Sequence, residues 1–121
     1  MSKKILVLDD DPDILEILSL ILVEAGYDIR TLTCGDNVFD HLNDFQPDLV
    51  LMDVMLAGMD GRSISRNIKE NHLTSSVPVI LISGTHDLVA SLHQPGAPND
   101  FVAKPFDIDY LLERIEKQLA E

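Results

Sequence analysis

Several short apolar runs in this chain are each followed at once by a residue that could do chemistry. The residues directly after these runs are Asp9, Asp10 and Asp11, then Asp53, then Ser83, and finally Lys104. Three kinds of group are therefore available: carboxylates, a hydroxyl and an ammonium. If the fold brings them together, they form a site of oxygen ligands with one fixed positive charge.

Such an acidic cluster needs a cation. Two carboxylates about 4 Å apart repel each other by roughly 4 kcal/mol at an effective dielectric constant of 20, which raises their pKa values unless a cation neutralises them. Magnesium suits a site that has only oxygen ligands, because it takes one or two carboxylates, keeps several waters and binds phosphate oxygens. We therefore expect Mg²⁺-assisted phosphoryl transfer, with Asp53 as nucleophile, Lys104 balancing charge and Ser83 donating a hydrogen bond.

The apolar runs themselves predict strands. They cover residues 5–8, 29–32, 49–52, 79–82 and 101–103. Three of them, 5–8, 49–52 and 79–82, are apolar at every position, which is typical of parallel strands covered on both faces. Helices must supply that cover.

Helical periodicity fills the intervals between the runs. Apolar residues recur at spacings of three and four behind Asp11-Pro12, namely Ile14, Ile17, Leu18, Ile21, Leu22 and Ala25, and Gly26 ends this pattern. The chain's last segment repeats the pattern behind Asp107, a predicted N-cap, with Ile108, Leu111, Leu112, Ile115 and Leu119. Weaker patterns predict helices at 37–43, 62–71 and 86–93. Strands and helices therefore alternate, which predicts a single α/β domain over residues 1–121 with a doubly wound, five-stranded parallel sheet.

The expected location of the chemistry follows from this fold. In open α/β sheets, ligands bind beyond the carboxyl ends of the strands. The acidic residues, Ser83 and Lys104 all stand at those ends, so residues far apart in sequence are expected to share one crevice. We adopt the flavodoxin-like strand order 2-1-3-4-5 by analogy.

Five sequence blocks resemble, in order and spacing, the receiver domain of bacterial response regulators of two-component signalling, the chemotaxis receiver among them. The blocks are residues 4–11, 48–56, 58–61, 78–84 and 100–106. The resemblance covers nearly the whole chain. It implies a phosphorelay role in which a histidine kinase or a phosphotransfer protein donates a phosphoryl group to the domain.

The resemblance also implies a role for each matching residue. Asp53 corresponds to the phosphoacceptor, Asp10 to a direct metal ligand, and Asp9 to an acidic partner that acts through metal-bound water. The backbone carbonyl of Met55 is expected to bind the metal. Ser83 and Lys104 match the hydroxyl and lysine that engage the phosphoryl group.

Two further expectations follow from the comparison with the family pattern. Phe101 matches the aromatic switch residue whose rotamer reports phosphorylation, together with Ser83. The stretch between Ser83 and Gly96 is shorter than the family pattern, and two prolines stand near its end. Helix 4 is therefore expected to be short or irregular, which leaves the usual dimer geometry open while a homodimer stays an expected assembly.

Composition narrows the class of protein. The net charge of −12 disfavours direct contact with nucleic acid or an anionic membrane surface. Cys34 is the only cysteine, which excludes an internal disulfide and a CxxC pair. The apolar run after Lys3 and Lys4 is too short for a signal peptide, and the stretch 14–23 is too short to span a bilayer. We expect a cytoplasmic protein.

Plainer interpretations exist for each residue alone. Aspartates at strand ends often only cap helices, which is the expected role of Asp11. Ser83 could be a turn residue, Lys104 a solvated charge and Phe101 a core aromatic. The functional interpretation depends on their occurring together.

Three functions compete. The first is a phosphorylation-dependent binding module that catalyses only its own phosphorylation and dephosphorylation and switches a downstream partner or output domain. The second is a Mg²⁺-dependent phosphatase or phosphotransferase with an aspartyl nucleophile, but such enzymes carry a second aspartate where this chain has Met55. The third is nucleotide binding, which would need a glycine-rich turn where Asp9, Asp10 and Asp11 stand.

Overall fold

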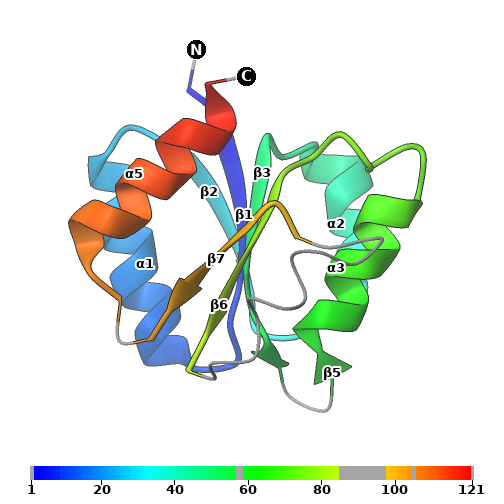
Figure 1. Ribbon diagram of the computed structural model, residues 1–121, viewed down its shortest axis with the longest axis horizontal. Coiled ribbons are helices and arrows are strands. Elements are labelled where there is room, and N and C mark those ends of the chain that lie inside the picture. The colour runs from blue at the N-terminus through cyan, green and yellow to red at the C-terminus, as the bar shows by residue number, and fades with distance from the viewer. Residues whose placement is uncertain (1, 57–58, 85–97, 105, 121) are drawn as a thin grey trace.

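The central feature is a parallel sheet with helices on both faces, seen in a computed structural model that describes residues 2–56, 59–84, 98–104 and 106–120 (Figure 1). Its strands are β1 (Lys4–Leu8), β2 (Asp28–Leu32), β3 (Leu49–Asp53), β6 (Val79–Ser83) and β7 (Asp100–Ala103). They lie in the order β2-β1-β3-β6-β7 and pair in parallel. This is the predicted order 2-1-3-4-5, and each strand extends the predicted apolar run by one residue.

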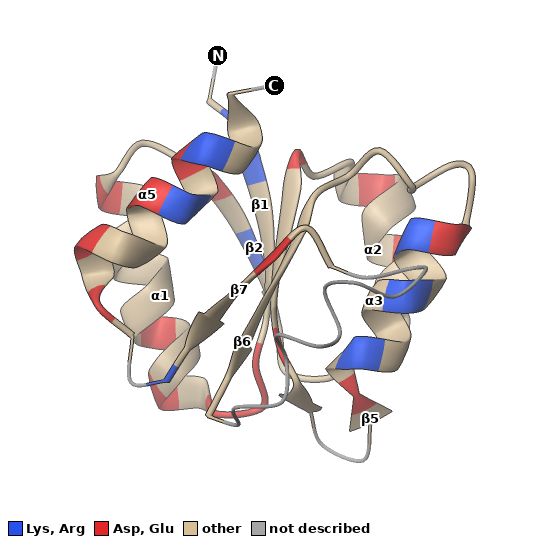
Figure 2. Ribbon diagram, in the orientation of Figure 1, with Lys and Arg blue, Asp and Glu red and all other residues tan. Residues whose placement is uncertain are grey.

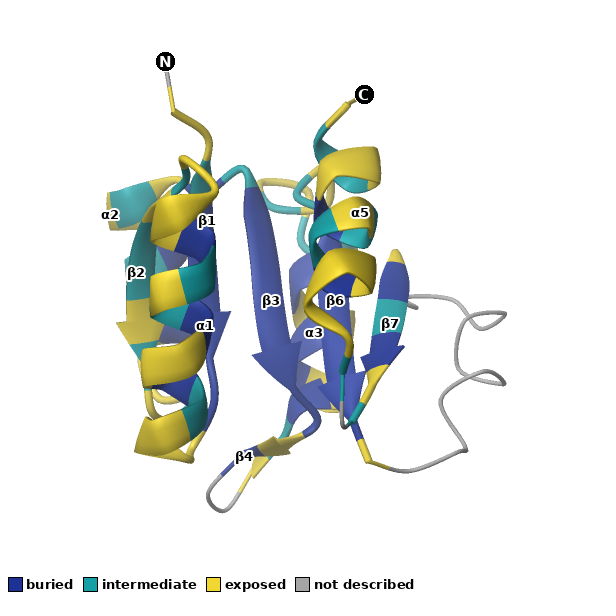
Figure 3. Cartoon of the chain, turned by 90° about the vertical axis from the view of Figure 1, so that its left-hand side faces the viewer, coloured by how far each residue is buried: buried dark blue, intermediate teal, exposed yellow. Residues whose placement is uncertain are grey.

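The three central strands are buried, as their unbroken apolar runs predict. Every residue of β3 and β6 is buried, and so are the last four of β1 (Figure 3). Alternate side chains point to opposite faces of a strand, so these runs feed two separate clusters of core residues. Strand β2 lies at the edge of the sheet and is only partly covered.

Helices α1 (Pro12–Glu24) and α5 (Ile108–Leu119) cover one face. Both begin at a predicted cap, because the Asp11 carboxylate accepts from the Asp13 N–H and the Asp107 carboxylate accepts from the Tyr110 N–H. The core on this face combines buried residues of the two helices with those of four strands: Ile5, Val7, Leu15, Leu18, Leu22, Leu49, Leu51, Ile80, Ile82, Val102, Leu111 and Ile115.

Helices α2 (Val38–Phe45) and α3 (Gly61–Glu70) cover the other face. They match the helices predicted at 37–43 and 62–71 within two residues at each end. Their buried side chains, among them Leu42, Ile64 and Ile68, pack against alternate residues of β1, β3 and β6. The predicted helix at 86–93, and with it the expectation of a short or irregular helix 4, lies outside the described residues.

One detail of α1 was predicted wrongly. The buried positions are Leu15, Leu18 and Leu22, whereas Ile17 is 47% exposed and Ala25 is also exposed. The helix is therefore rotated relative to the predicted stripe, and Leu15 takes the core position that we assigned to Ile17. Apolar residues lie around much of this helix, so a spacing of three and four fits more than one face.

A second difference is a small hairpin next to β3. Strands β4 (Met55–Leu56) and β5 (Met59–Asp60) pair antiparallel, with Met55 opposite Asp60. The sequence analysis did not predict it, because two-residue strands carry no periodicity. Within the described residues, no helix has the length and apolar character needed to cross a membrane.

Candidate functional site

The carboxyl ends of β1, β3 and β7 bring together one side chain each. The Lys104 Nζ lies 2.8 Å from Oδ2 of Asp53 and 3.5 Å from Oδ2 of Asp9. Lys104 lies 51 positions after Asp53 and 95 positions after Asp9 in the sequence, yet the parallel sheet places all three at one edge. The predicted convergence at the strand ends is therefore confirmed for Asp9, Asp53 and Lys104.

Three carboxylates cluster at this site. Oxygen atoms of Asp9, Asp10 and Asp53 all lie within 4.8 Å of one another. Asp9 is fully buried and Asp53 is 5% exposed, while Asp10 is open to solvent. Figure 2 shows acidic segments at the ends of β1 and β3 and a basic segment directly after β7.

Backbone amides fix the two buried carboxylates. The Asp11 N–H donates to Oδ1 of Asp9 at 2.9 Å, and the Met55 N–H donates to Oδ1 of Asp53 at 3.1 Å. Each carboxylate thus has one oxygen held by an amide two residues on, while the other faces Lys104. Because these donors are local backbone groups, the carboxylates are oriented before any ligand binds.

The electrostatics of the site favour a further cation. Burial raises the pKa of Asp9 above its ordinary value, although the Asp11 amide opposes the shift, and the negative charge of Asp53 raises it further. Burial lowers the pKa of Lys104, but the hydrogen bond from Lys104 to Asp53 and the charges of Asp53 and Asp9 outweigh burial, so the pKa is raised. Lys104 therefore stays an ammonium at neutral pH, and it is paired with two of the three carboxylates in the cluster, those of Asp9 and Asp53.

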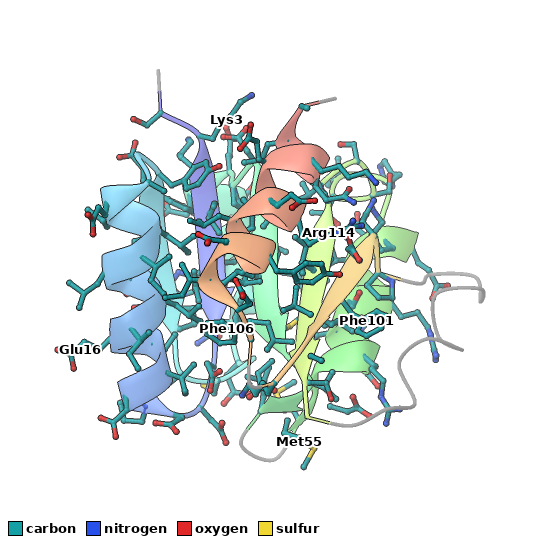
Figure 4. The ribbon with its side chains drawn as sticks, turned by 60° about the vertical axis from the view of Figure 1, so that its left-hand side comes forward. Lys3, Glu16, Met55, Phe101, Phe106 and Arg114 are labelled. Atoms are coloured by element: carbon teal, nitrogen blue, oxygen red, sulfur yellow. The ribbon has the colours of Figure 1, made fainter. Side chains whose placement is uncertain are left out.

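Ser83 lies at the same edge and Phe101 lies two residues before the end of β7, and neither belongs to the carboxylate cluster. Ser83 is the last residue of β6, is 1% exposed, and its carbonyl accepts from the Lys104 N–H at 2.8 Å. Phe101 is half-buried on β7 and packs against the core on the α2 and α3 face. Figure 4 shows Phe101 on β7. Both residues lie on strands that the sequence analysis predicted, and their roles at the site and as switch residues stay predictions.

Met55 contributes its backbone rather than its side chain. Its N–H holds Asp53, while the residue is 68% exposed and its side chain projects outward at the bottom of the view in Figure 4. A metal bond from its carbonyl stays a prediction.

Sequence reasoning missed one residue at this site. Gly61 packs against the peptide that follows Asp53, with its N–H donating to the Val54 carbonyl at 2.7 Å. The only available signal was its place in the block 58–61, which gives no hint of a contact with Asp53.

The donor set fits magnesium. The cluster offers carboxylate oxygens alone, without nitrogen or sulfur ligands among its members, and part of it faces solvent through Asp10. Such a set leaves room for waters and phosphate oxygens, as Mg²⁺ requires. The arrangement can therefore hold a hard cation beside a buried, oriented carboxylate.

Comparison with known proteins identifies relatives of this chain. The model of the response regulator receiver domain family matches residues 5–116. The DNA-binding response regulator MtrA of Mycolicibacterium smegmatis is 33% identical over 120 residues, which cover 98% of this chain and 51% of that protein. The chain thus spans about half the length of the curated relatives that it matches.

Two solved structures are similar over nearly the whole chain. The signal receiver domain of a signal transduction histidine kinase from Syntrophus aciditrophicus has a TM-score of 0.89 at 30% identity, covering 98% of this chain and 91% of that one. The receiver domain of the sensor histidine kinase PA1611 from Pseudomonas aeruginosa PAO1 has a TM-score of 0.84 at 23% identity, with both chains fully covered. That second structure has a magnesium ion coordinated in its active site cleft, and at this identity the likeness shows the fold.

Proposed function

The chain belongs to the response regulator receiver domain family, and on this premise we propose that Asp53 accepts a phosphoryl group and so switches the surface of the domain. One observation carries the assignment: the buried Asp53 carboxylate lies 2.8 Å from the Lys104 ammonium and within the cluster formed with Asp9 and Asp10. An aspartate that only ends a strand or caps a helix would not need a lysine and two further carboxylates beside it.

The reaction is a transfer between two covalent carriers. An oxygen of Asp53 forms a bond to phosphorus while the bond from phosphorus to the donor breaks, and the donor keeps that electron pair. The donor is a phosphohistidine of a histidine kinase or of a phosphotransfer protein, and its imidazole regains a proton from solvent. Hydrolysis of the resulting acyl phosphate restores Asp53.

The chain's own residues prepare Asp53 for this step. The Met55 N–H fixes Oδ1, so the carboxylate presents a defined face to an incoming phosphoryl group. Lys104 supplies a positive charge where negative charge accumulates as the phosphoryl group approaches. We propose that the Ser83 hydroxyl then binds a phosphoryl oxygen and that Phe101 changes its rotamer in response.

Asp9, Asp10, Asp53 and the carbonyl of Met55 would hold the magnesium ion. When bound, Mg²⁺ offsets the negative charge of the carboxylates and of the phosphoryl oxygens. Support comes from the oxygen-only cluster in this chain and from the magnesium ion in the cleft of the PA1611 receiver domain.

The proposed partners follow from this role. A histidine kinase or phosphotransfer protein supplies the phosphoryl group, and a downstream protein or an output domain reads the altered surface. The net charge of −12 argues that any contact with DNA is made by another domain rather than by this one. We also propose that the domain turns over no external metabolite and is not an enzyme in that sense.

Phosphorylation by acetyl phosphate tests the assignment. The wild type is incubated with acetyl phosphate and Mg²⁺, and intact mass is measured alongside Asp53→Ala and the control Asp40→Asn, which changes an exposed aspartate on α2. We expect one phosphoryl adduct on the wild type and the control and none on Asp53→Ala. An adduct on Asp53→Ala equal to that of the wild type would overturn the proposal.

A further inference from the structure

Gly61 leaves no room for a side chain. A Cβ atom at this position would lie 2.3 Å from the carbonyl oxygen of Asp53 and 3.0 Å from the Cα of Val54. Both neighbours are backbone atoms, which cannot swing aside as the end of a side chain can. Any other residue here must therefore push the start of α3 away from the strand end that carries Asp53.

The need for glycine at this position is steric. Among the described glycines, Gly26 has a positive φ of 97°, and Gly61 does not. A side chain at Gly61 would thus face no conformational penalty of its own. What it would disturb is the contact with the peptide between Asp53 and Val54.

Hydrogen bonds hold the backbone of Val54 on both sides, one through its carbonyl and one through its N–H. The Gly61 N–H donates to the Val54 carbonyl at 2.7 Å, and the Val54 N–H donates to the Ile82 carbonyl on β6 at 3.0 Å. The chain therefore leaves Asp53, runs through the hairpin of β4 and β5, and returns to the backbone of Asp53 and Val54 at Gly61. This contact closes the loop that contains Met55.

We propose that Gly61 is a positioning residue for phosphoryl transfer. By letting α3 lie directly on the Asp53–Val54 peptide, it sets the orientation of the Asp53 carboxylate and the position of the Met55 backbone. The link is physical, since the Met55 N–H holds Oδ1 of Asp53 at 3.1 Å. The inference rests on the proposed function, in which that carboxylate is the nucleophile and the Met55 carbonyl is a metal ligand.

The size of the disturbance sets the expected effect. A Cβ at Gly61 must move about 1 Å relative to the Asp53 oxygen before the two reach an ordinary contact distance of 3.4 Å. A misplacement of about 1 Å at a reacting group lowers a reaction rate by on the order of 10²-fold. We therefore expect a large loss of rate from one added methyl group.

Two other glycines serve as matched controls. Nothing lies within 4 Å of a Cβ at Gly26, so Gly26→Ala introduces only backbone strain, far from Asp53. A Cβ at Gly35 would meet the Ile64 Cδ1 at 2.4 Å and the Met59 Sδ at 3.0 Å, which are side-chain atoms that can shift. Gly35→Ala therefore introduces a clash of similar closeness that spares the Asp53 backbone.

The test compares Gly61→Ala, Gly26→Ala and Gly35→Ala with the wild type. Three quantities are measured: the rate of phosphorylation across acetyl phosphate concentrations, Mg²⁺ affinity by isothermal titration calorimetry, and the melting temperature without Mg²⁺. We expect Gly61→Ala to lower the maximal rate about 10²-fold and to weaken Mg²⁺ binding. Gly26→Ala should lower the melting temperature yet keep the wild-type rate, and Gly35→Ala should also keep it.

The results that would overturn the role of Gly61 differ from the result that would refute the proposed function. A Gly61→Ala protein with wild-type rate and wild-type Mg²⁺ affinity would overturn the proposal, as would losses of rate in all three variants that merely follow their melting temperatures. A wild type that takes no phosphoryl group at Asp53 would instead refute the proposed function, and the Mg²⁺ titrations would then decide the role of Gly61.

A measurement on the wild type covers the case in which Gly61→Ala does not fold. In a ¹⁵N NMR titration with Mg²⁺, we expect the amide resonances of Gly61 and Met55 to shift together with one dissociation constant, while that of Gly26 stays in place. A Met55 resonance that shifts without any change at Gly61 would contradict the proposed coupling.

Discussion

The Lys104 ammonium and the Asp53 carboxylate form an ion pair of 2.8 Å that joins the end of β3 to the residue after β7. The Asp53 side chain is 7% exposed and that of Lys104 is 27% exposed, so the pair is largely shielded from water. Asp9 shares the same ammonium at 3.5 Å. One cation therefore compensates two buried carboxylates when no metal is bound.

Replacing this lysine should affect both stability and reaction rate. In Lys104→Met, Asp9 and Asp53 lose the ammonium that accompanies them in a buried place, so we expect the metal-free protein to lose about 1–3 kcal/mol of unfolding free energy. The phosphorylation rate should fall by about 10²-fold, because a fixed positive group beside the reacting oxygens is gone. Urea unfolding and acetyl phosphate kinetics check the two effects. Lys117→Met, a change at an exposed residue of α5, serves as control, and equal behaviour of both variants would contradict the prediction.

The sequence predicted most of the fold because the central strands are buried on both faces. An apolar run without interruption has few other interpretations when turn residues and helical patterns flank it. The orientation of α1 was harder, because Ile17, Leu20 and Val23 are all exposed although they are as apolar as the buried Leu15. When apolar residues surround a helix, spacing alone does not select the buried face.

The site was predictable to the extent that it follows from strand ends. Parallel strands deliver their last residues to one edge, and this rule alone brings Asp9, Asp53 and Lys104 together. The contact between Gly61 and the Asp53 peptide depends on how the hairpin of β4 and β5 folds back. No periodicity or residue type encodes that path, so it needed coordinates.

Magnesium should stabilise the protein, and Asp10 should control how strongly. Because Asp10 is exposed, Asp10→Asn is expected to leave the metal-free melting temperature unchanged or slightly higher, since it relieves repulsion in the cluster. The increase in stability on adding Mg²⁺ should shrink, by about 1.4 kcal/mol for each tenfold loss of affinity when the ion is in excess. Melting curves with and without Mg²⁺ measure both effects. Asp36→Asn, an exposed aspartate outside the cluster, should show the wild-type increase, and the same increase in Asp10→Asn would exclude a role as ligand.

The start of α3 should show a pH dependence that traces to Asp60. The hydrogen bond from Arg62, supported by the Arg62 backbone N–H and by nearby positive charge, lowers the pKa of this N-cap carboxyl below its ordinary value of 3.8. A lowered folded-state pKa means that the stabilisation is complete above 3.8 and is lost as the pH falls through the folded-state value. Asn caps helices about as well as Asp, so Asp60→Asn removes mainly the ion pair with Arg62.

Urea unfolding of the wild type and Asp60→Asn across pH 3 to pH 7 measures this contribution. The Asp60 side chain is 41% exposed, so solvent screening limits the wild-type advantage at pH 7 to less than about 1 kcal/mol. The difference between the two proteins should shrink as the pH falls below 3.8. A difference that is constant with pH would show that the carboxylate charge plays no part.

A second ion pair, between Asp100 and Arg114, joins the start of β7 to α5. Nε and Nη2 of Arg114 both contact Oδ2 of Asp100, whose Oδ1 accepts from the Phe101 N–H at 2.9 Å. The two side chains are 10% and 23% exposed, so this pair is far better shielded than the pair of Arg30 and Asp44, where the aspartate is 75% exposed. Removing one partner of a buried pair leaves an uncompensated charge, which is more damaging than removing both.

We therefore expect Arg114→Met to lower the unfolding free energy by about 3 kcal/mol. The double variant Asp100→Asn with Arg114→Met should recover part of this loss, because no buried charge is left without a partner. Asp44→Asn, which breaks the exposed pair, should lower it by less than about 1 kcal/mol. Urea unfolding of these three variants, of Asp100→Asn alone and of the wild type gives the full comparison. Asp100→Asn alone gives the reference for additivity. If the losses of unfolding free energy in the two single variants add up to the loss in the double variant, the two residues act independently, and the predicted coupling between β7 and α5 is wrong.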